Sequence, residues 1–349
     1  MSRKVYLDEG PGETRAVIAL DGQPERLLIE RAGDRPEHRP GARLAARVRR
    51  VERALATAFL DVGSAPDAVL ALTGDAARLA EGAAIEVEVL NPPREGKGAV
   101  VRLIGPAGRE PGLMAAAPTL AARLQALAPG VEATAGRVAR EAADLAESQA
   151  LAILHRLPSG GAIAIEPTRA LIAVDVDVGG ASGDARRAVL KANREALAAC
   201  ARLLRLKGLG GPVVIDLAGK GHDGEALKQA AGAAFAPDQP GVAFGPITRF
   251  GLWPLVLPRR AAPIAEILGA SGGMPTAETL ALRLLRVIEA AAGPGLRIEA
   301  RAAPEVAATA NALAAHLMGR IGPRFRIVSD ESIPRASPMV APITAPFEG

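Results

Sequence analysis

Apolar and polar residues alternate in short segments of the first third of the chain, a pattern that predicts strands with one buried face. Residues 4–10 form one such segment, and residues 14–30 form another that a turn at Asp21-Gly22 divides into a hairpin. Four further short runs, separated by Gly, Pro and Asp, lie at 42–55, 56–63, 67–72 and 83–91. Strands at this spacing predict a small β-barrel.

Helical periodicity appears in the middle of the chain. Residues 117–130 predict a short helix, and residues 137–157 predict a longer amphipathic helix that ends before Pro158. We assign no chemistry to this stretch.

Strands and helices alternate in the second half. Residues 161–166 and 169–178 predict a hairpin, and Asp184 caps a predicted helix at 185–206. A strand at 212–216 and a helix at 224–235 follow. This alternation predicts a mixed sheet covered by helices, with strand-end residues forming a crevice.

The last part of the chain predicts a separate small unit after the linker GASGGMP. It has the order helix, strand, helix, strand, at residues 276–293, 296–304, 305–322 and 324–330. The Pro-rich tail, residues 331–349, lacks periodicity and is predicted to be mobile.

Three aspartates lie where predicted strands end. Asp175 and Asp177 close the run ALIAVDVD, and Asp216 closes the run PVVID. An oxygen-only cluster suits Mg²⁺ or Mn²⁺, which use one or two carboxylates together with waters and a substrate phosphate. Strand-end aspartates are also ordinary turn formers and helix caps, so the pattern alone leaves both interpretations open.

Composition limits the class of protein. Of the 349 residues, 49% are hydrophobic and 23% are charged, which excludes a disordered or fibrous chain. The N-terminal sequence MSRKVYLDEG lacks the apolar core of a signal peptide, and no apolar run reaches the length of a membrane span. We therefore expect a cytoplasmic protein. The single cysteine, Cys200, is expected to be a small buried residue, because one thiol forms neither an internal disulfide nor a thiolate cluster.

Charge is distributed unevenly although the net charge is only +4. Nine arginines lie between Arg26 and Arg53, as on a surface that tracks phosphates. Arginine is common throughout the chain, so an ordinary basic surface remains an alternative. Phe59 is the only aromatic residue between Tyr6 and Phe235, which makes it the candidate for stacking an RNA base, with core packing as the other interpretation.

The loop after Asp216, with the sequence AGKGHDGE, lies between a predicted strand and a predicted helix. It lacks the GxxxxGK[ST] spacing of a nucleotide-binding P-loop. His222 within it could act as a general base, although a solvated loop histidine is the simpler interpretation.

Three motifs, in order, resemble the catalytic half of the ribonuclease E/G family. They are LPSGGAIAIEPTRALIAVDVDVGG (157–180), VLKANREALAACARLLRLKGLGGPVVIDL (189–217) and ITRFGL (247–252). Residues 48–72 resemble the family's OB-fold, residues 94–102 resemble the element after it, and residues 276–330 resemble its small C-terminal domain. The chain is therefore identified as a shortened member of this family.

The resemblance implies an α+β fold. It comprises an OB-fold barrel inserted near the N-terminus, a mixed α/β catalytic domain of DNase I-like type with a covered sheet, and a small C-terminal α/β domain. The expected units are strands of a reduced RNase H-like subdomain (1–35), the OB-fold (36–105), a helical remnant of the sensor and RNase H-like region (106–157), the catalytic domain (158–262), the C-terminal domain (263–330) and a flexible tail (331–349).

The resemblance also implies an activity: Mg²⁺-dependent endonucleolytic cleavage of single-stranded RNA, with Mn²⁺ as a possible substitute. The metal is expected at Asp175 and Asp216, with Asp177 as a third catalytic acceptor. RNA contacts are expected from the residues Phe59, Lys97, Arg47, Arg49 and Arg50. The expected partners are RNA and, in a homodimer, a second copy, with no membrane.

Several residues depart from the family's pattern. Asp177 stands where the family has asparagine, Gly219 and Pro254 replace two family acids, and Val69 replaces a second phenylalanine of the OB-fold. The family's zinc-binding CPxC link is absent, so no zinc is expected. These changes keep open a second hypothesis, an RNA-binding paralogue with impaired catalysis. A third is an interaction module that docks partners through its Pro-rich tail.

The family's RTAG signature, which belongs to its sensor of RNA 5′ ends, is reduced to VEATAG at residues 131–136, with Ala133 in place of the arginine. We therefore predict little preference for 5′-monophosphorylated RNA. Cleavage rates of otherwise identical monophosphorylated and triphosphorylated RNAs should agree within a few-fold; a strong difference between them would contradict this prediction.

Overall fold

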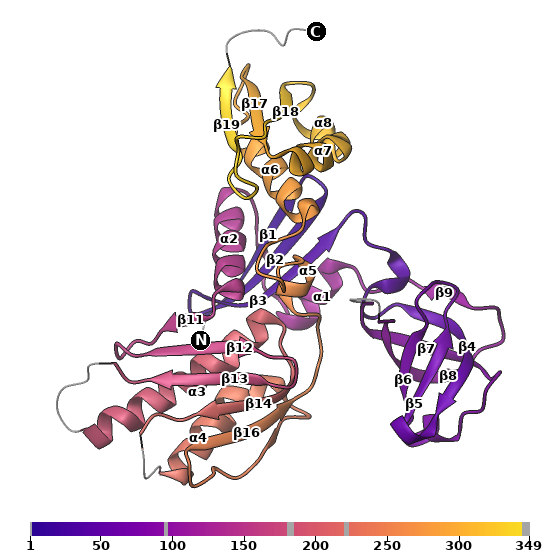
Figure 1. The fold of residues 1–349 in the computed structure, drawn as a ribbon, viewed down its shortest axis with the longest axis vertical. Coiled ribbons are helices and arrows are strands. Elements are labelled where there is room, and N and C mark those ends of the chain that lie inside the picture. The colour runs from indigo at the N-terminus through magenta and orange to yellow at the C-terminus, as the bar shows by residue number, and fades with distance from the viewer. Residues whose placement is uncertain (1, 94–96, 180–184, 220–222, 344–349) are drawn as a thin grey trace.

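The computed structural model describes residues 2–93, 97–179, 185–219 and 223–343 (Figure 1). It contains four β-sheets with helices packed against three of them. The short 3₁₀ helices are Pro36–His38, Arg53–Leu55, Gly74–Arg78 and Ala236–Asp238.

The N-terminal sheet has the strand order β10-β1-β2-β3. Its strands are β1 (Arg3–Gly10), β2 (Glu13–Leu20), β3 (Gln23–Arg31) and β10 (Ala133–Thr134). The hairpin predicted at Asp21-Gly22 is confirmed, since both residues have positive φ, at 48° and 80°, as a two-residue type I′ turn requires. The expected alternation also holds, with Val17 facing one core and its neighbours Ala16 and Ile18 facing another.

A closed five-stranded barrel follows, as predicted. Its ring order is β4-β5-β6-β8-β7, closed by pairing of β4 with β5, and β6 runs parallel to β8. This order is consistent with the expected OB-fold. The strands are β4 (Arg43–Glu52), β5 (Thr57–Asp61), β6 (Ala68–Ala71), β7 (Ala84–Asn91) and β8 (Val100–Pro106), with β9 (Gly112–Ala115) paired to β4 outside the ring.

The third sheet contains the predicted acidic strand ends. Its order is β11-β12-β13-β14-β16-β15. The strands are β11 (Leu154–Arg156), β12 (Ala162–Pro167), β13 (Ile172–Asp177), β14 (Gly211–Asp216), β15 (Ala243–Phe244) and β16 (Leu252–Leu257). Strands β13 and β14 are parallel and joined through helix α3 (Ala185–Lys207), and helix α4 (Gly224–Phe235) packs beside α3. The mixed α/β architecture is thus present, whereas its DNase I-like type stays a prediction.

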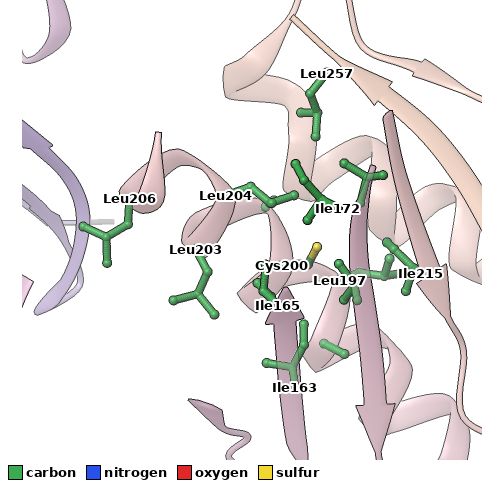
Figure 2. Packing of buried hydrophobic residues seen from close by; sticks show 14 of the residues in the cluster. Ile163, Ile165, Ile172, Leu197, Cys200, Leu203, Leu204, Leu206, Ile215 and Leu257 are labelled. Atoms are coloured by element: carbon green, nitrogen blue, oxygen red, sulfur yellow. The ribbon is translucent and has the colours of Figure 1, made fainter. Parts of the chain in front are cut away.

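One hydrophobic core joins this sheet to the N-terminal sheet. Figure 2 shows the α3 side chains Leu197, Cys200 and Leu204 packed against Ile163, Ile172 and Ile215 of the sheet. The same core continues to Val17 and Ile29 of the N-terminal sheet through helix α2 (Arg137–Leu151). Helix α1 (Leu120–Leu127) covers the other face of that sheet. Residues 117–157, to which the sequence assigned no chemistry, therefore provide the two helices, α1 and α2, that cover the two faces of the N-terminal sheet.

Cys200 is fully buried, as expected for a small apolar residue. Burial raises the pKa of its thiol to about 12.

The predicted helix at 137–157 is too long. Helix α2 ends at Leu151, and residues 154–156 form β11, an edge strand paired with β12. The pairing of Leu154 with Ala164 and the adjoining bond from Ile165 N–H to Ile153 O, at 3.0 Å, stabilise this strand, and local periodicity cannot reveal such partners.

The C-terminal unit has its own core and a three-stranded sheet of order β18-β17-β19. Its elements are α6 (Ala277–Ala291), β17 (Arg297–Ala302), α7 (Pro304–Ala312), α8 (Ala314–Ile321), β18 (Phe325–Ser329) and β19 (Met339–Ile343), and the short helix α5 (Ile264–Ile267) precedes it. The prediction of one helix at 305–322 is wrong, because the chain bends at Leu313 between α7 and α8.

The prediction of a mobile tail is also wrong for part of its length. Residues 339–343 form β19, which pairs antiparallel with β17 and so protects that strand's free edge. Residues 344–349 lie outside the described part of the chain. The remaining domain boundaries expected from the sequence stay predictions.

Buried ion pairs tie the C-terminal unit and α2 to the N-terminal sheet. Arg286 of α6 donates to Asp8 of β1 at 2.6 Å, and both side chains are 5% exposed. Glu147 of α2 contacts Arg15 of β2 and Arg283 of α6. Such pairs fix the position of the elements, because separating either partner would leave a charge without compensation in the interior.

Glu13 is the most enclosed acid of this network. Its carboxylate, with a fully buried side chain, accepts from Arg15 Nε at 2.5 Å and from Arg31 Nε at 2.9 Å. Burial alone would raise the pKa of Glu13, but the two guanidinium groups lower it below its ordinary value.

We predict that Glu13→Gln lowers the free energy of unfolding by about 3–5 kcal/mol at neutral pH, because it leaves two buried arginines short of an anion. The matched control is Glu225→Gln, which removes an exposed ion pair with Lys228 and should change stability by less than about 1 kcal/mol.

Urea unfolding at several pH values checks this prediction. A carboxyl whose pKa is lowered in the folded state stabilises the protein at pH values above its ordinary pKa, and this effect is lost as the pH falls. The free energies of unfolding of Glu13→Gln and of the unmodified protein should therefore converge in acid. An equal decrease in the free energy of unfolding in Glu13→Gln and Glu225→Gln at neutral pH would contradict the prediction.

Candidate functional site

The three predicted aspartates lie together at one edge of the third sheet, and we call Asp175, Asp177 and Asp216 the acidic edge. Asp175 of β13 is directly in register with Asp216 of β14. Asp177 lies two residues further along β13, on the same face, opposite Ala162 of β12. All three residues are exposed. The sequence therefore predicted both their proximity and their position at strand ends.

Alternation along the strands explains why the carboxylates face solvent. On β13 the residues Ile172, Val174 and Val176 are buried against α3, so the residues between them face away from it. Asp216 follows the buried Ile215 of β14 in the same way. The helices thus cover only one face of the sheet, and the acidic edge lies on the open face.

Asp175 and Asp216 fit a hard divalent cation. Neighbouring strands lie roughly 4.7–4.9 Å apart, so two carboxylates in register can both reach a cation that needs oxygen ligands at about 2.1 Å. Neither side chain has a hydrogen bond or an ion pair with any other residue in the described ranges, so their oxygens remain available. Such a pair leaves room for the waters and substrate oxygens that Mg²⁺ retains.

Asp177 is placed differently from the other two. Its Oδ1 accepts a hydrogen bond from Gly179 N at 3.0 Å, the bond of a turn-forming aspartate. Among the residues that the structure describes, no group of three or more His, Cys, Asp or Glu side chains is arranged to hold a metal ion. The expected third acceptor at Asp177 therefore stays a prediction, and the site as observed is a pair.

Asn193 holds the backbone that follows Asp216 in place, a role that was not predicted from the sequence. This buried residue of α3 donates to Ala218 O and accepts from Ala218 N, both at 3.0 Å. Both bonds fix the backbone two residues after Asp216. The signal was present in the sequence: Asn193 is a polar residue on the same helical stripe as Leu197, Cys200 and Leu204.

Gly219 has a structural reason for lacking the family's acid. Its φ is +78°, and a Cβ at this position would lie 2.9 Å from Val189 Cγ1. A side chain here would strain the backbone and collide with α3. The next residues, 220–222 with His222, lie outside the described part of the chain, as does Asp184.

An exposed aromatic turn adjoins the acidic edge. Residues 248–251 are the last part of the connection from β15 to β16, and Gly251 O accepts a hydrogen bond from Leu217 N, next to Asp216, at 3.2 Å. Phe250 in this turn is 73% exposed, and the Arg249 guanidinium lies 4.7 Å from the centre of its ring. The sequence reasoning noted this motif only as part of a resemblance and gave neither residue a role.

The predicted RNA-binding residues of the barrel form a second group. Arg50 and Phe59 are partners across β4 and β5, and the Arg50 guanidinium lies 4.6 Å from the centre of the Phe59 ring. Phe59 is only half-buried, so one face of this pair can contact a base. Val69, which replaces a second aromatic residue, lies directly opposite Phe59 on β6.

Arg47 and Arg49 already have acidic neighbours. Arg49 contacts Asp61 at 2.8 Å and Asp67 at 3.2 Å, and Arg47 lies 3.6 Å from Glu110. Asp61, with its pKa lowered by a hydrogen bond from Gly63 and by Arg49, remains ionised beside these arginines. The local basic charge is therefore smaller than the sequence suggested.

The barrel strands β4 and β5, which carry Arg50 and Phe59, lie apart from the strands β13 and β14 that carry the acidic edge (Figure 1). Lys97, expected near the RNA, lines a cavity with Thr168, Ile172 and Pro212, which belong to the opposite end of β13 and β14. Six residues of strand separate the two ends, about 16 Å. The structure thus brings together the acids with one another and Phe59 with Arg50, but does not join the two groups.

Comparison with known proteins connects the acidic edge to one family. Residues 123–259 match the sequence model of the Ribonuclease E/G family. Ribonuclease E of Escherichia coli and Ribonuclease E of Haemophilus influenzae are each 34% identical over 146 residues, 38% of this chain and 14% and 16% of those proteins. Ribonuclease E of Nostoc sp. is 36% identical over 126 residues, 34% of this chain and 18% of that protein.

The expected resemblance is therefore confirmed for the segment that carries Asp175, Asp216 and Phe250. The barrel, residues 43–106, lies outside the matched segment. Each match spans less than a fifth of the relative's length. In the described ranges, no helix combines the length and apolarity needed to cross a membrane.

We predict that Asn193→Ala lowers the free energy of unfolding by about 2–3 kcal/mol, because it leaves the buried Ala218 N–H and C=O without partners. Hydrogen exchange at Ala218 and Gly219 should accelerate. Asn311→Ala, which removes a single bond of 3.4 Å to Ile327 O at a less buried site, is the control and should have a smaller effect. Unchanged exchange at Ala218 would contradict the supporting role of Asn193.

Proposed function

We propose that this chain, whose resemblance to the ribonuclease E/G family is shown over residues 123–259, is a metal-dependent endoribonuclease that cuts single-stranded RNA. The observation that carries the proposal is the pairing of Asp175 with Asp216, in register and unbonded, on the open face of the matched segment. Two such carboxylates suit Mg²⁺, with Mn²⁺ as a substitute.

Mg²⁺ held there would polarise the phosphodiester. It would also lower the pKa of a bound water molecule, so that this water could lose a proton near neutral pH. The chain's own residues supply the framework. Asp175 and Asp216 offer one carboxylate each from adjacent strands, while Asn193 holds the backbone beyond Asp216. Asp177, bonded to Gly179, adds negative charge at a distance of one strand repeat from the pair.

Phe250 and Arg249 are suited to hold the RNA beside the acids. A ring that is 73% exposed offers a face on which a base can stack, and the guanidinium can contact phosphate. Together with Phe59 and Arg50 on the barrel, they make two stacking positions for one flexible strand. Neither position presents an arrangement that reads base edges, so we expect low sequence specificity.

We predict that Asp175→Asn or Asp216→Asn reduces Mg²⁺-dependent cleavage of a labelled single-stranded RNA at least about 100-fold. Loss of a residue that only hydrogen-bonds a metal ligand already lowers metal affinity or activity by about 10- to 100-fold, and loss of a ligand itself should cost more. Chelation of the metal should have the same effect. The control is Glu166→Gln, an exposed acid of β12 directed to the same face at the far end of the sheet.

Cleavage that survives both aspartate substitutions would overturn the assignment. Loss of cleavage in Glu166→Gln as well would show that general charge, rather than the acid pair, controls the reaction.

We predict that Phe250→Ala weakens binding of a short single-stranded RNA by roughly 5- to 150-fold, corresponding to about 1–3 kcal/mol for one stacked base. Fluorescence anisotropy at fixed salt measures this change. Phe250→Trp keeps an aromatic face and should bind within a few-fold of the unmodified protein. Equal affinities of the alanine and tryptophan variants would contradict stacking at this position.

A catalytically impaired RNA-binding paralogue is the second candidate. It is favoured by Asp177, Gly219 and Pro254, which replace residues of the family's pattern, and by the separation of the barrel from the acidic edge. Such a protein would bind RNA with steep salt dependence and leave it intact in the presence of Mg²⁺ or Mn²⁺. The expected homodimer stays a prediction that sedimentation analysis can test.

A further inference from the structure

A second cavity, far from the acidic edge, lies where the N-terminal sheet, the end of α3 and the segment around α5 meet. Its volume is about 430 Å³, within the usual range for small-molecule sites. Gly208 and Ala261, which line it, lie next to the start of β14, whereas Asp216 ends that strand. About 16 Å of strand therefore separates the two sites.

Positive charge dominates the wall of this cavity, which we call the arginine cavity. Among the described residues, seven arginines line it together with two carboxylates, those of Glu30 and Asp34. Five of the seven have carboxylate partners: Arg31 contacts Glu13, Arg35 contacts Glu37, Arg39 and Arg123 contact Glu30, and Arg205 contacts Glu25 at 3.0 Å and Asp238 at 2.5 Å.

Arg26 lacks such compensation. Its side chain is half-buried and makes no hydrogen bond or ion pair with any residue in the described part of the chain. Burial lowers the pKa of Arg26; the nearby carboxylates of Glu25 and Asp238 oppose this shift, and the cations Arg205 and Arg260 add to it. A half-buried guanidinium without a direct carboxylate contact can bind an anion.

Two further N–H groups of the wall are unsatisfied. The Nε atoms of Arg39 and Arg205 are buried and have no hydrogen-bond partner. Buried donors without a partner are rare, because each costs free energy relative to its solvated state. Arg39 and Arg205 line the same cavity as Arg26.

Apart from His38, the rest of the lining is apolar or glycine. It includes Leu27, Pro40, Pro92, Ile264 and Ile267. A lining that combines arginines with apolar side chains matches a ligand with a flat hydrophobic part and a phosphate. Inorganic phosphate alone would leave most of the volume and all of the apolar wall without contacts.

We propose that the arginine cavity binds a nucleoside phosphate, with the phosphate against Arg26 and the base against the apolar wall. The ligand is a free nucleotide rather than the end of an RNA chain, in agreement with the little preference for 5′-monophosphorylated RNA that the sequence predicts. Binding here does not require the acidic edge, so it can succeed or fail independently of RNA cleavage.

Calorimetric titration of the full chain with AMP and GMP tests the proposal. We expect saturable binding, at least about tenfold tighter than that of adenosine or of inorganic phosphate, because only a nucleotide uses both sides of the wall. Arg26→Ala should weaken binding by about 10- to 100-fold, the effect of one hydrogen bond to a charged group. Arg137→Ala, an arginine of α2 that is 88% exposed, is the control and should bind normally.

Thermal unfolding without ligand must first show that Arg26→Ala folds; Arg26→Gln, which keeps most of the side-chain length, takes its place if it does not. Competition with an oligonucleotide that carries a terminal phosphate then distinguishes a free nucleotide from an RNA end. Failure of the oligonucleotide to displace AMP is expected for a site that binds free nucleotides, and displacement of AMP by the oligonucleotide would overturn the assignment to a free nucleotide. Absence of nucleotide binding at millimolar concentration, or unchanged binding in the Arg26 variant, would overturn the proposal.

Discussion

The parallel pairing of β13 with β14 is the constraint on which the candidate site depends. Two parallel neighbours require a crossover connection, and α3 provides it while covering one face of the sheet. The crossover brings Asp175 and Asp216, 41 positions apart in sequence, into register at the same end of their strands. Because α3 and α4 cover only one face, the carboxylates remain exposed on the other. Packing of the helix thus creates the acid pair and leaves it accessible.

A second constraint holds the surrounding framework. The buried pairs of Asp8, Glu13 and Glu147 with arginines join the N-terminal sheet to α2 and α6. Most of these acids lie far in sequence from their partners, so they form only in the complete fold. The same arginine-rich composition that supplies this network also leaves Arg26, in the described ranges, without a hydrogen bond or ion pair at the arginine cavity. The arginines of the network differ from Arg26 in this respect, since each contacts a carboxylate directly.

Local sequence rules predicted those features whose stabilising contacts are local. Alternation located the strands that carry Asp175 and Asp216, and Asp21-Gly22 specified a hairpin turn. These rules failed where contacts between residues far apart in the sequence determine the local structure. Residues 154–156 and 339–343 became strands because β12 and β17 offered free edges. The role of Asn193 depends on Ala218, 25 residues away, and the distance of Phe59 from the acids depends on how the barrel is attached. Periodicity contains none of this information.

Metal binding measured directly, without RNA, tests the central claim that the Asp175–Asp216 pair is a divalent-cation site. Titration with Mn²⁺, followed by electron paramagnetic resonance, should show a site whose affinity falls at least about tenfold in Asp175→Asn and in Asp216→Asn. Asp177→Asn should retain most of the affinity, because that carboxylate is already bonded to Gly179. Equal Mn²⁺ affinities in the unmodified protein and in both variants of the pair would contradict the account.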